Sequence, residues 1–348
     1  THTLDLLNKT LQETSLDLRP MLGILRKFQR DTACNTCVDD RPPPLTALDA
    51  AVRLPWRGVE LPQLYAWPNG RLGNLMGEYA TLFALHKIYN VTVAITPAFY
   101  RELQPYFKKL SIPVIKKFRT RDWLDVRRDF DGAAFTYKTS HLAASGLLGP
   151  HRFLLRDYPF EVGLFNAFRD EVLQEFTFSD EIVKKARLRL ENLTYNHTQP
   201  VTLVGVHVRL TDYVDFMTQT FHTKHLLASY ARYLRRSTNY FLERYPNVIF
   251  VVASDNMKRA HNIFYKYVRV RSVLFEGGGS AAEDMSLLAQ CDHHIITLGS
   301  FGFWTAYLGR GVAVYPFLSS STYPFTKPVY DAARLNNFVA IPFEDPLT

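Results

Sequence analysis

The sequence predicts an α/β protein whose second half folds as a doubly wound parallel sheet. From residue 201 to residue 317, short apolar runs rich in β-branched residues alternate with segments of helical length and pattern. This alternation is typical of parallel strands that are covered by helices. The run 201–208 is the clearest strand, and the polar residues His207, Arg209 and Asp212 mark its end. Ligands of open α/β sheets bind outside the carboxyl ends of the strands, so this edge is the expected site.

The first half predicts a less regular α/β unit behind a leader. Residues 1–60 contain a run of prolines and are predicted to be a stem-like segment. Residues 61–195 are predicted to form an N-terminal α/β domain and residues 196–348 a C-terminal one, with the polar loop 192–200 as the boundary. In the N-terminal domain we expect a turn at 69–74, a helix at 75–89, a strand at 91–95, and helices at 165–176 and 180–193.

The C-terminal domain has the more regular pattern. Strands are expected at 201–208, 248–253, 271–275, 293–298 and 312–317. The helices between them are expected near 222–244, 256–267, 281–291 and 301–309.

Length and composition limit the possible classes of protein. The chain of 348 residues is long enough for two domains with separate cores. Its 47% hydrophobic and 21% charged residues are ordinary for a globular protein and argue against a disordered chain. The net charge of +8 suits a phosphorylated partner but decides little alone. The longest apolar runs fall short of the ~20 residues that span a bilayer. We therefore expect either a secreted protein without its signal peptide, or the lumenal part of a protein whose membrane anchor lies outside this chain.

Glycosylation signals predict the secretory pathway. Asn-x-Thr triplets begin at four positions, of which two fall in the loop 192–200: Asn8, Asn90, Asn192 and Asn196. Cys34 and Cys37 could form a tight disulfide in an oxidising lumen, while Cys291 follows an apolar helix and is most simply a buried thiol. The sequence gives no oligomeric state.

Polar groups gather at the predicted carboxyl edge of the second sheet. Ser254 and Asp255 end the second strand, and a third strand runs into three glycines at 277–279. The segment Gly299-Ser300-Phe301-Gly302 opens a helix, so its free backbone N–H groups and the positive helix end make an anion site. A capping box at 280–283 fixes the next helix start, and Asp284 in its first turn could face a base or ribose. Alternatively, Ser300 and Asp284 serve only their helix starts. Three such places on one edge favour a nucleotide site.

Other candidates are weaker. Asp129 and Asp131 have the Asp-x-Asp spacing that holds a metal in many nucleotide-sugar enzymes, but they lie in an arginine-rich loop that favours a solvated surface pair. The basic stretch 108–128 suggests nucleic acid by charge alone, and a glycosylated lumenal protein is not expected to meet any.

Four ordered segments of this chain resemble the animal galactoside α-1,2-fucosyltransferases. GRLGNLMGEYA at 70–80 is similar to that family's GRLGNQMGxYA, and VLQEF at 172–176 to its LQEF. VGVHVRLTDY at 204–213 resembles its HxRRxDY donor motif. The stretch from Asp284 to Trp304 resembles its closing signature. The resemblance covers about residues 65–345.

The resemblance implies a GT-B architecture, in which two Rossmann-like domains face a cleft and the C-terminal one binds GDP-β-L-fucose without a metal or cofactor. It implies that Arg209 pairs with the pyrophosphate, with His207 supporting its loop, and that Asp284 contacts the guanosine. It also implies that Ser300, Phe301 and Gly302 hold phosphate through backbone amides, and that Gly70 and Asn74 close the site from the N-terminal domain. The implied chemistry is inverting transfer of fucose to a galactose 2-hydroxyl in the Golgi lumen, by a type II membrane protein.

Two departures and one open role remain. The second arginine of HxRRxDY is Leu210 here, and the glutamine of GNQMG is Leu75. Because side chains alternate along an extended segment, residue 210 should point away from the side that Arg209 faces. For the general base we place Asp215 first, with Asp212 and Glu78 behind it. Asp212 is more simply a residue that positions Arg209.

Three other functions compete with this prediction. The protein could transfer fucose to a different acceptor, such as a core glycan or a protein hydroxyl. It could be a catalytically silent glycan-binding relative in which Leu210 marks lost turnover. A heparin- or nucleic-acid-binding module driven by net charge would show steep salt dependence and indifference to Arg209.

Overall fold

The computed structural model describes residues 62–115, 123–127, 129–131, 134–195, 197–221, 226–318 and 324–343, together with the strand pair at 55–56 and 59–60. Most of the stem-like segment lies outside the described residues, as do Asn8, Asn196, Cys34 and Cys37. Across the described part, none of the helices combines the length and the apolar character that a bilayer crossing needs.

The second sheet is the doubly wound parallel sheet that the sequence predicts. Its strands are β9 (Thr202–Val208), β10 (Val248–Ser254), β11 (Val273–Phe275), β12 (His293–Ile295), β13 (Ala313–Phe317) and β14 (Phe338–Pro342). They pair in the order β11-β10-β9-β12-β13-β14, and every pair is parallel. This is the Rossmann order, in which the chain direction across the sheet reverses between β9 and β12. A ligand crevice is expected at that point.

Helices cover both faces of this sheet. They are α10 (Tyr213–Phe221), α11 (Leu226–Leu242), α12 (Met257–Ile263) with the π-helical turn η3 (Phe264–Val268), α13 (Ala281–Ala289), α14 (Ser300–Leu308) and α15 (Lys327–Ala332). Alternate residues of a strand enter different cores: Val204 packs in the larger cluster, and its neighbour Leu203 packs against the smaller one. The capping box at the start of α13 forms as predicted, with Glu283 N donating to Ser280 Oγ and Ser280 N donating to Glu283 Oε2.

The first sheet is also parallel, with four strands in the order β4-β3-β8-β5. These are β3 (Gln63–Ala66), β4 (Thr92–Ile95), β5 (Trp123–Val126) and β8 (Arg152–Leu155), with a hairpin of β6 (Asp129–Asp131) and β7 (Ala134–Thr136). Its helices are α4 (Leu72–Tyr89), α5 (Pro97–Leu103) and α6 (Lys138–Ala144). Of the elements just given, the sequence predicts only α4 and β4, and its placing of Asp129 and Asp131 in a loop is wrong because they form β6. The expected turn at 69–74 is wrong in its second half, because α4 begins at Leu72.

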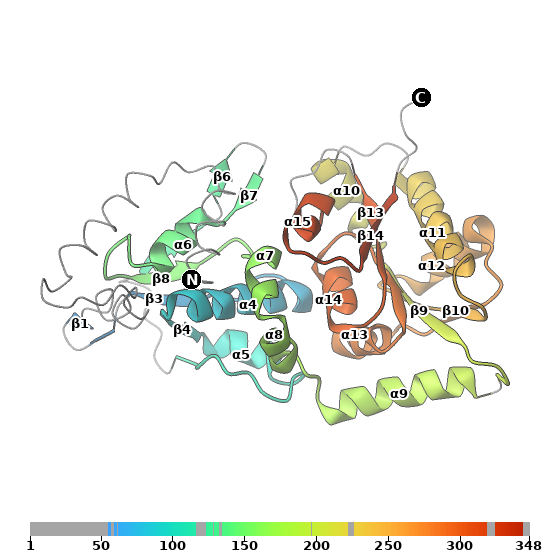
Figure 1. Ribbon diagram of the computed structural model, residues 1–348, viewed down its shortest axis with the longest axis horizontal. Helices are drawn as coiled ribbons and strands as arrows, with labels where there is room; N and C mark the ends of the chain where they lie inside the picture. Colours follow the sequence, from blue (N-terminus) through green and yellow to red (C-terminus); the bar gives the residue numbers. More distant parts are fainter. Residues whose placement is uncertain are drawn as a thin grey trace, which may run out of the picture.

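A helical connection leads from one domain to the other. It comprises α7 (Val162–Phe165), the 3-10 turn η2 (Asn166–Phe168), α8 (Arg169–Glu175) and α9 (Asp180–Thr194). Figure 1 shows α9 running along the second domain, and Ala186 and Leu190 pack there with Val251. Asn192 is exposed in the last turn of α9, so the prediction that it lies in a loop is wrong. The division of the chain at residue 196 stays a prediction.

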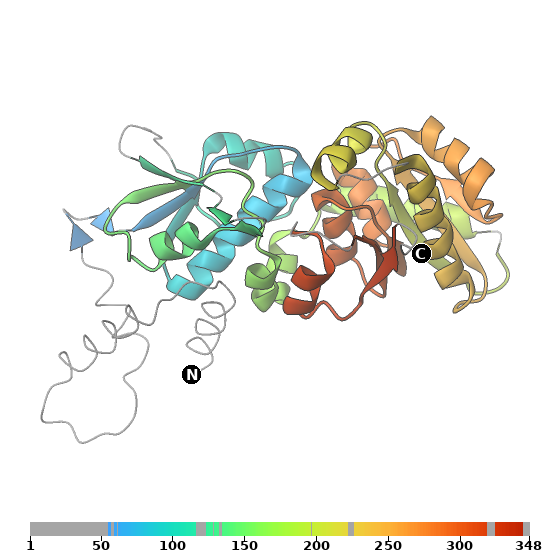
Figure 2. The same ribbon diagram turned by 90° about the horizontal axis from the view of Figure 1, so that it is seen from above.

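The two domains share one core. Phe165 of α7 stacks on Trp304 of α14 with ring centroids 5.4 Å apart, and Phe176 lies 4.9 Å from the same indole. Phe160 packs on Phe303 at 5.4 Å. Figures 1 and 2 show α4 and α14 between the two sheets. The predicted arrangement, two Rossmann-like α/β domains facing each other as in GT-B, is thus confirmed, and the helix ends at their junction frame the site.

Candidate active site

A pocket of about 410 Å³ opens where the two domains meet. It lies at the carboxyl ends of β9 and β10 and at the amino ends of α4, α13 and α14, where the Rossmann order predicts a ligand crevice. Its lining is formed by Arg71, Leu72, Gly73, Asn74, His207, Arg209, Ala253, Ser254, Asp255, Gly278, Gly279, Ala281, Asp284, Ser300 and Phe301.

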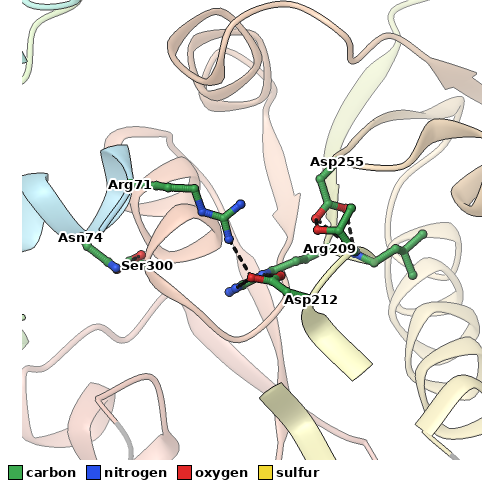
Figure 3. Close-up of polar contacts among 8 residues, drawn as sticks. Arg71, Asn74, Arg209, Asp212, Asp255 and Ser300 are labelled. Atoms are coloured by element: carbon green, nitrogen blue, oxygen red, sulfur yellow. Dashed lines mark hydrogen bonds and ion pairs between the residues drawn. The ribbon is translucent and has the colours of Figure 1, made fainter. Parts of the chain in front are cut away.

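Arg209 and Arg71 bring two guanidinium groups to this pocket from opposite domains. Asp212 joins them: Arg209 donates to both of its carboxylate oxygens, at 2.7 and 2.6 Å, and Arg71 Nη2 donates to Oδ2 at 2.9 Å. Figure 3 shows both side chains converging on Asp212. These hydrogen bonds from Arg209 are the first cause that lowers the pKa of Asp212 to about 2. Asp212 therefore stays ionised and acts as the shared counter-charge.

Helix ends add further positive potential at the same place. A Cβ built on Gly299, the residue before α14, would lie 3.3 Å from Arg209 Nη1, so the guanidinium sits over the start of that helix. The first turn of α4 meets the first turn of α14, where Ser300 Oγ donates to Asn74 Oδ1 at 2.5 Å. Amino ends of helices carry partial positive charge and free N–H groups. Asp212 is the carboxylate that both arginines bind, while the carboxylates of Asp255 and Asp284 accept from the backbone N–H groups of neighbouring loops. The guanidinium groups and the helix ends are donors of the kind that bind anions.

The loop that carries Arg209 is held from behind by Asp255. Its carboxylate accepts from Leu210 N at 2.7 Å and from both the N–H and the hydroxyl of Thr211. Arg259 Nη1 donates to the carbonyl of Leu210 at 3.0 Å. The Leu210 side chain is 1% exposed and packs in the core, which confirms that it points away from the side that Arg209 faces.

His207 supports the floor of the pocket as a neutral side chain. It is hydrogen-bonded through Nδ1 to Thr297 Oγ1 at 2.8 Å, and its ring packs on Phe301 with centroids 4.6 Å apart. Burial lowers the pKa of His207 to about 3. Gly302 lies behind this ring, where a Cβ would come within 2.6 Å of the carbonyl oxygen of Thr297.

Asp284 shapes the far wall. Its two carboxylate oxygens accept from Gly278 N and Gly279 N, each at 3.2 Å, so it holds the glycine loop that follows β11. This loop lines the pocket together with Ala281. Asp284 therefore organises the loop as well as lying in the first turn of its helix.

The predicted residues fall into two groups. His207, Arg209, Asn74, Ser254, Asp255, Asp284, Ser300 and Phe301 belong to the lining. Within the described part of the chain, the lining does not include Gly70, Asp212, Asp215 or Gly302. Gly70 lies beside Asn74 with a left-handed φ of 79°, and Asp215 is exposed in the first turn of α10.

Glu78, another candidate base, is fully buried in α4. Burial raises the pKa of its carboxyl to about 9, and it accepts from Asn69 N at 3.2 Å. Sequence reasoning missed Arg71 and Gly73 as functional residues. A charged residue inside the GRLGN segment was the available signal for Arg71.

No cluster of three or more His, Cys, Asp or Glu side chains that could hold a metal ion occurs among the described residues. The donors at the pocket are instead guanidinium groups, backbone N–H groups and hydroxyls, which suit a phosphorylated ligand.

A Rossmann sheet with a pocket at its switch point, facing a second α/β domain, is the arrangement of a GT-B type protein. Comparison with known sequences gives the family. The pattern of glycosyl transferase family 11 matches residues 59–341, so the chain belongs to that family.

Related proteins cover most of the chain. Galactoside alpha-(1,2)-fucosyltransferase 2 of Pongo pygmaeus is 36% identical over 270 residues, which are 73% of this chain and 71% of the relative. The Bos taurus protein of the same name is 34% identical over 323 residues, 86% of each chain. Galactoside 2-alpha-L-fucosyltransferase Sec1 of Mus musculus is 35% identical over 269 residues, 74% of this chain and 66% of the relative. Among solved structures, a mutant of Arabidopsis thaliana FUT1 in complex with GDP has a TM-score of 0.49 at 12% identity, over 86% of this chain and 79% of that one.

Proposed function

We propose that this protein is an inverting galactoside α-1,2-fucosyltransferase that moves L-fucose from GDP-β-L-fucose to the 2-hydroxyl of a terminal β-galactoside. Membership of glycosyl transferase family 11 and the names of its relatives support the reaction. The Asn-x-Thr glycosylation triplets support a lumenal compartment, and we place the enzyme in the Golgi. We further propose that it works without a metal, because the charges it needs are already present as guanidinium groups and helix ends.

One observation carries the donor assignment: Arg209 sits over the amino end of α14 at the Rossmann switch point, with Arg71 across the pocket. A guanidinium and aligned N–H groups match a diphosphate in both charge and geometry. We assign the diphosphate to Arg209 and to the amides at the start of α14. The guanosine then extends toward Ser254 and the glycine loop that Asp284 holds.

This arrangement would accelerate the departure of GDP. The acceptor hydroxyl attacks C1 of fucose from the face opposite the diphosphate, so the C1–O bond to phosphate breaks as the new C–O bond forms. Negative charge then grows on the β-phosphate. Groups already aimed at that charge favour the transition state over the ground state, and losing one such donor typically costs ~10²–10³ in kcat.

The proton of the acceptor hydroxyl needs less help from the protein. The Asp212 carboxylate binds two guanidinium groups and its pKa is held near 2, so it is a weak proton acceptor. We therefore assign Asp212 to positioning Arg209 and Arg71. Asp215 remains our candidate base; it is exposed in the first turn of α10 and outside the pocket lining, so it would have to act on an acceptor hydroxyl at the mouth of the pocket.

Product analysis tests the function directly. The protein would be incubated with GDP-fucose, a chelator and a panel of β-galactosides, and the linkage of the product determined. We expect an α-1,2-linked fucose on galactose. A different linkage would indicate another acceptor, and glycan binding without release of GDP would indicate a silent relative.

A matched pair of arginine variants tests the donor assignment. Arg209→Ala should lower kcat by at least ~10²-fold, while Arg209→Lys should recover only part of it because the bidentate geometry is lost. Arg271→Ala is the control, because Arg271 is exposed just before β11, at the opposite edge of the sheet. Near-normal turnover in Arg209→Ala would refute the assigned role.

A further inference from the structure

A second set of polar and aromatic side chains lies at the carboxyl edge of the first sheet. Strands β3, β8 and β5 are neighbours there and all run in the same direction. Trp67 follows β3, Arg127 follows β5, and Asp157 follows β8. Because the carboxyl edge of a parallel sheet is where such folds bind ligands, this cluster is a candidate site in its own right.

The chain after β8 has an unusual backbone conformation. Asp157 and Tyr158 are consecutive and both left-handed, with φ of 62° and 58°. Residues in this conformation persist where their surroundings enforce them. Here the hydroxyl of buried Tyr137 lies 2.7 Å from the carbonyl oxygen of Asp157 and 2.6 Å from that of Tyr158. On the other side, Glu161 N donates to Thr81 Oγ1 of α4 at 3.1 Å.

The result is an exposed aromatic ring beside the donor pocket. Tyr158 is 45% exposed although its neighbours Pro159 and Phe160 are buried. A Cβ built on Gly70 would lie 2.9 Å from Tyr158 Cε1, so the ring edge packs against the residue before Arg71. Tyr158 therefore stands at the rim of the pocket, on the wall that the N-terminal domain supplies.

Charged groups of both signs surround the two residues that precede Tyr158 in the chain. Arg127 Nη1 lies 3.5 Å from Asp157 Oδ1, and its Nη2 lies 3.2 Å from Asp125. Arg156 Nε donates to the other oxygen of Asp125 at 3.2 Å, and its guanidinium lies 5.3 Å from the centre of the Trp67 ring. Carboxylates accept hydrogen bonds from hydroxyl groups and guanidinium groups donate them. With the exposed ring of Tyr158 and the half-buried ring of Trp67, these groups suit a ligand that is rich in hydroxyls, has apolar C–H faces and carries no net charge.

We propose that Tyr158 and Asp157, with Trp67 on the far side of Arg156, form the acceptor subsite, which holds the galactoside against the donor pocket. The proposal rests on the proposed function, because it assigns the second substrate of that reaction. The Tyr158 ring would pack on the apolar face of the sugar, and the Asp157 carboxylate would accept from its hydroxyls. The enforced backbone sets the ring in place before the sugar arrives, which reduces the ordering cost of binding.

Substitution of Tyr158 tests the subsite, because it should raise the KM for the galactoside and leave the KM for GDP-fucose nearly unchanged. Tyr158→Asn suits the left-handed backbone because asparagine tolerates it, and it removes the ring. We expect the KM for the galactoside to rise roughly tenfold, as for the loss of one aromatic contact, with the KM for GDP-fucose within about twofold of wild type. Tyr158→Phe keeps the ring and should keep most of the acceptor affinity. Tyr265→Asn is the control, since Tyr265 is 78% exposed on η3 of the other domain.

Direct binding separates this proposal from the function it rests on. Galactoside binding to the protein saturated with GDP would be followed by saturation-transfer NMR, which needs no turnover. If wild type binds galactoside but transfers no fucose, the proposed function fails and the subsite stands. If wild type transfers fucose and Tyr158→Asn binds galactoside unchanged, the subsite is wrong. Asp157→Asn, which keeps the backbone preference and removes one charge, gives a second test if Tyr158→Asn does not fold. It should raise the acceptor KM several-fold, and an unchanged value would overturn the proposal.

Discussion

Gly73→Ala probes the contact between the two helix ends that frame the proposed donor pocket. An added Cβ would lie 2.7 Å from Phe301 N and 2.8 Å from the carbonyl carbon of Ser300. Ordinary van der Waals contact begins at 3.4 Å, and both partners are backbone atoms that no rotamer change can move. The methyl group must therefore push α4 and α14 apart.

The energetic cost has two parts and one offset. Overpacking of this kind costs ~1–3 kcal/mol. The displacement also strains the hydrogen bonds from Ser300 Oγ to Asn74 and from Trp304 Nε1 to Gly73 O, each worth about 1 kcal/mol. Alanine recovers up to ~1 kcal/mol through its higher helix propensity. We expect the free energy of unfolding to fall by about 1–3 kcal/mol, and the Kd for GDP to rise about tenfold as the amides of α14 leave their position.

Urea unfolding and calorimetric titration with GDP would measure the two effects. Gly163→Ala is the matched control, because a Cβ there meets no atom within 4 Å and Gly163 also lies in a helix. The control should be unchanged or slightly more stable, with wild-type affinity for GDP. If Gly73→Ala unfolds at the wild-type urea concentration and binds GDP with wild-type affinity, the two helix ends do not pack as described.

Three further variants probe the charges of the site. Arg71→Ala should change the free energy of unfolding by less than ~1 kcal/mol, because its ion pair with Asp212 is exposed. It should nevertheless raise the Kd for GDP and make that Kd less dependent on salt, which titrations at two ionic strengths would measure. His207→Asn should make the free energy of unfolding depend less on pH. The pKa of His207 is about 3 in the folded protein and 6.5 for the free side chain, so between those values only the unfolded chain binds this proton. The free energy of unfolding of wild type should therefore fall by up to ~1.4 kcal/mol per pH unit below pH 6.5. Urea unfolding at pH 5 and pH 7 compares them, and equal slopes would contradict the neutral assignment. Asp255→Asn weakens the hydrogen bonds that hold the loop of Arg209 and should lower kcat roughly tenfold, with little change in the free energy of unfolding. Steady-state kinetics and urea unfolding would measure the two effects.

The sequence predicts the second domain far better than the first. Strands such as β9 and β10 are seven residues long, apolar and flanked by polar ends, so their type and the edge that they present follow from local pattern. In the first sheet, β3, β5 and β8 have four residues each and begin with glutamine, tryptophan and arginine. Runs that short carry no usable period, and their pairing is set by contacts between segments far apart in the chain.

The same distinction applies to the site. Arg209 and Asp255 follow strands and His207 is near the end of β9, so all three could be placed on one edge by topology alone. Gly73 could not, because its importance comes from a contact with Ser300 more than two hundred residues away. Asp215 fails to reach the lining because a helix begins at Tyr213 and carries it to an exposed position. Sequence spacing gave no sign of that helix start.

The contacts that hold the two domains together also build the pocket. Trp304 packs among Phe160, Phe165 and Phe176 of the first domain, and its indole N–H donates to the carbonyl of Gly73 at the pocket wall. The next turn back on α14 carries Ser300, which binds Asn74. Separating the walls would expose this aromatic cluster to water, at ~25 cal/mol per Å² of apolar surface. The free energy of folding thus fixes the distance between the backbone segments that carry Arg209 and Arg71, and preorganised charges of this kind would need little reorganisation in the proposed departure of the diphosphate.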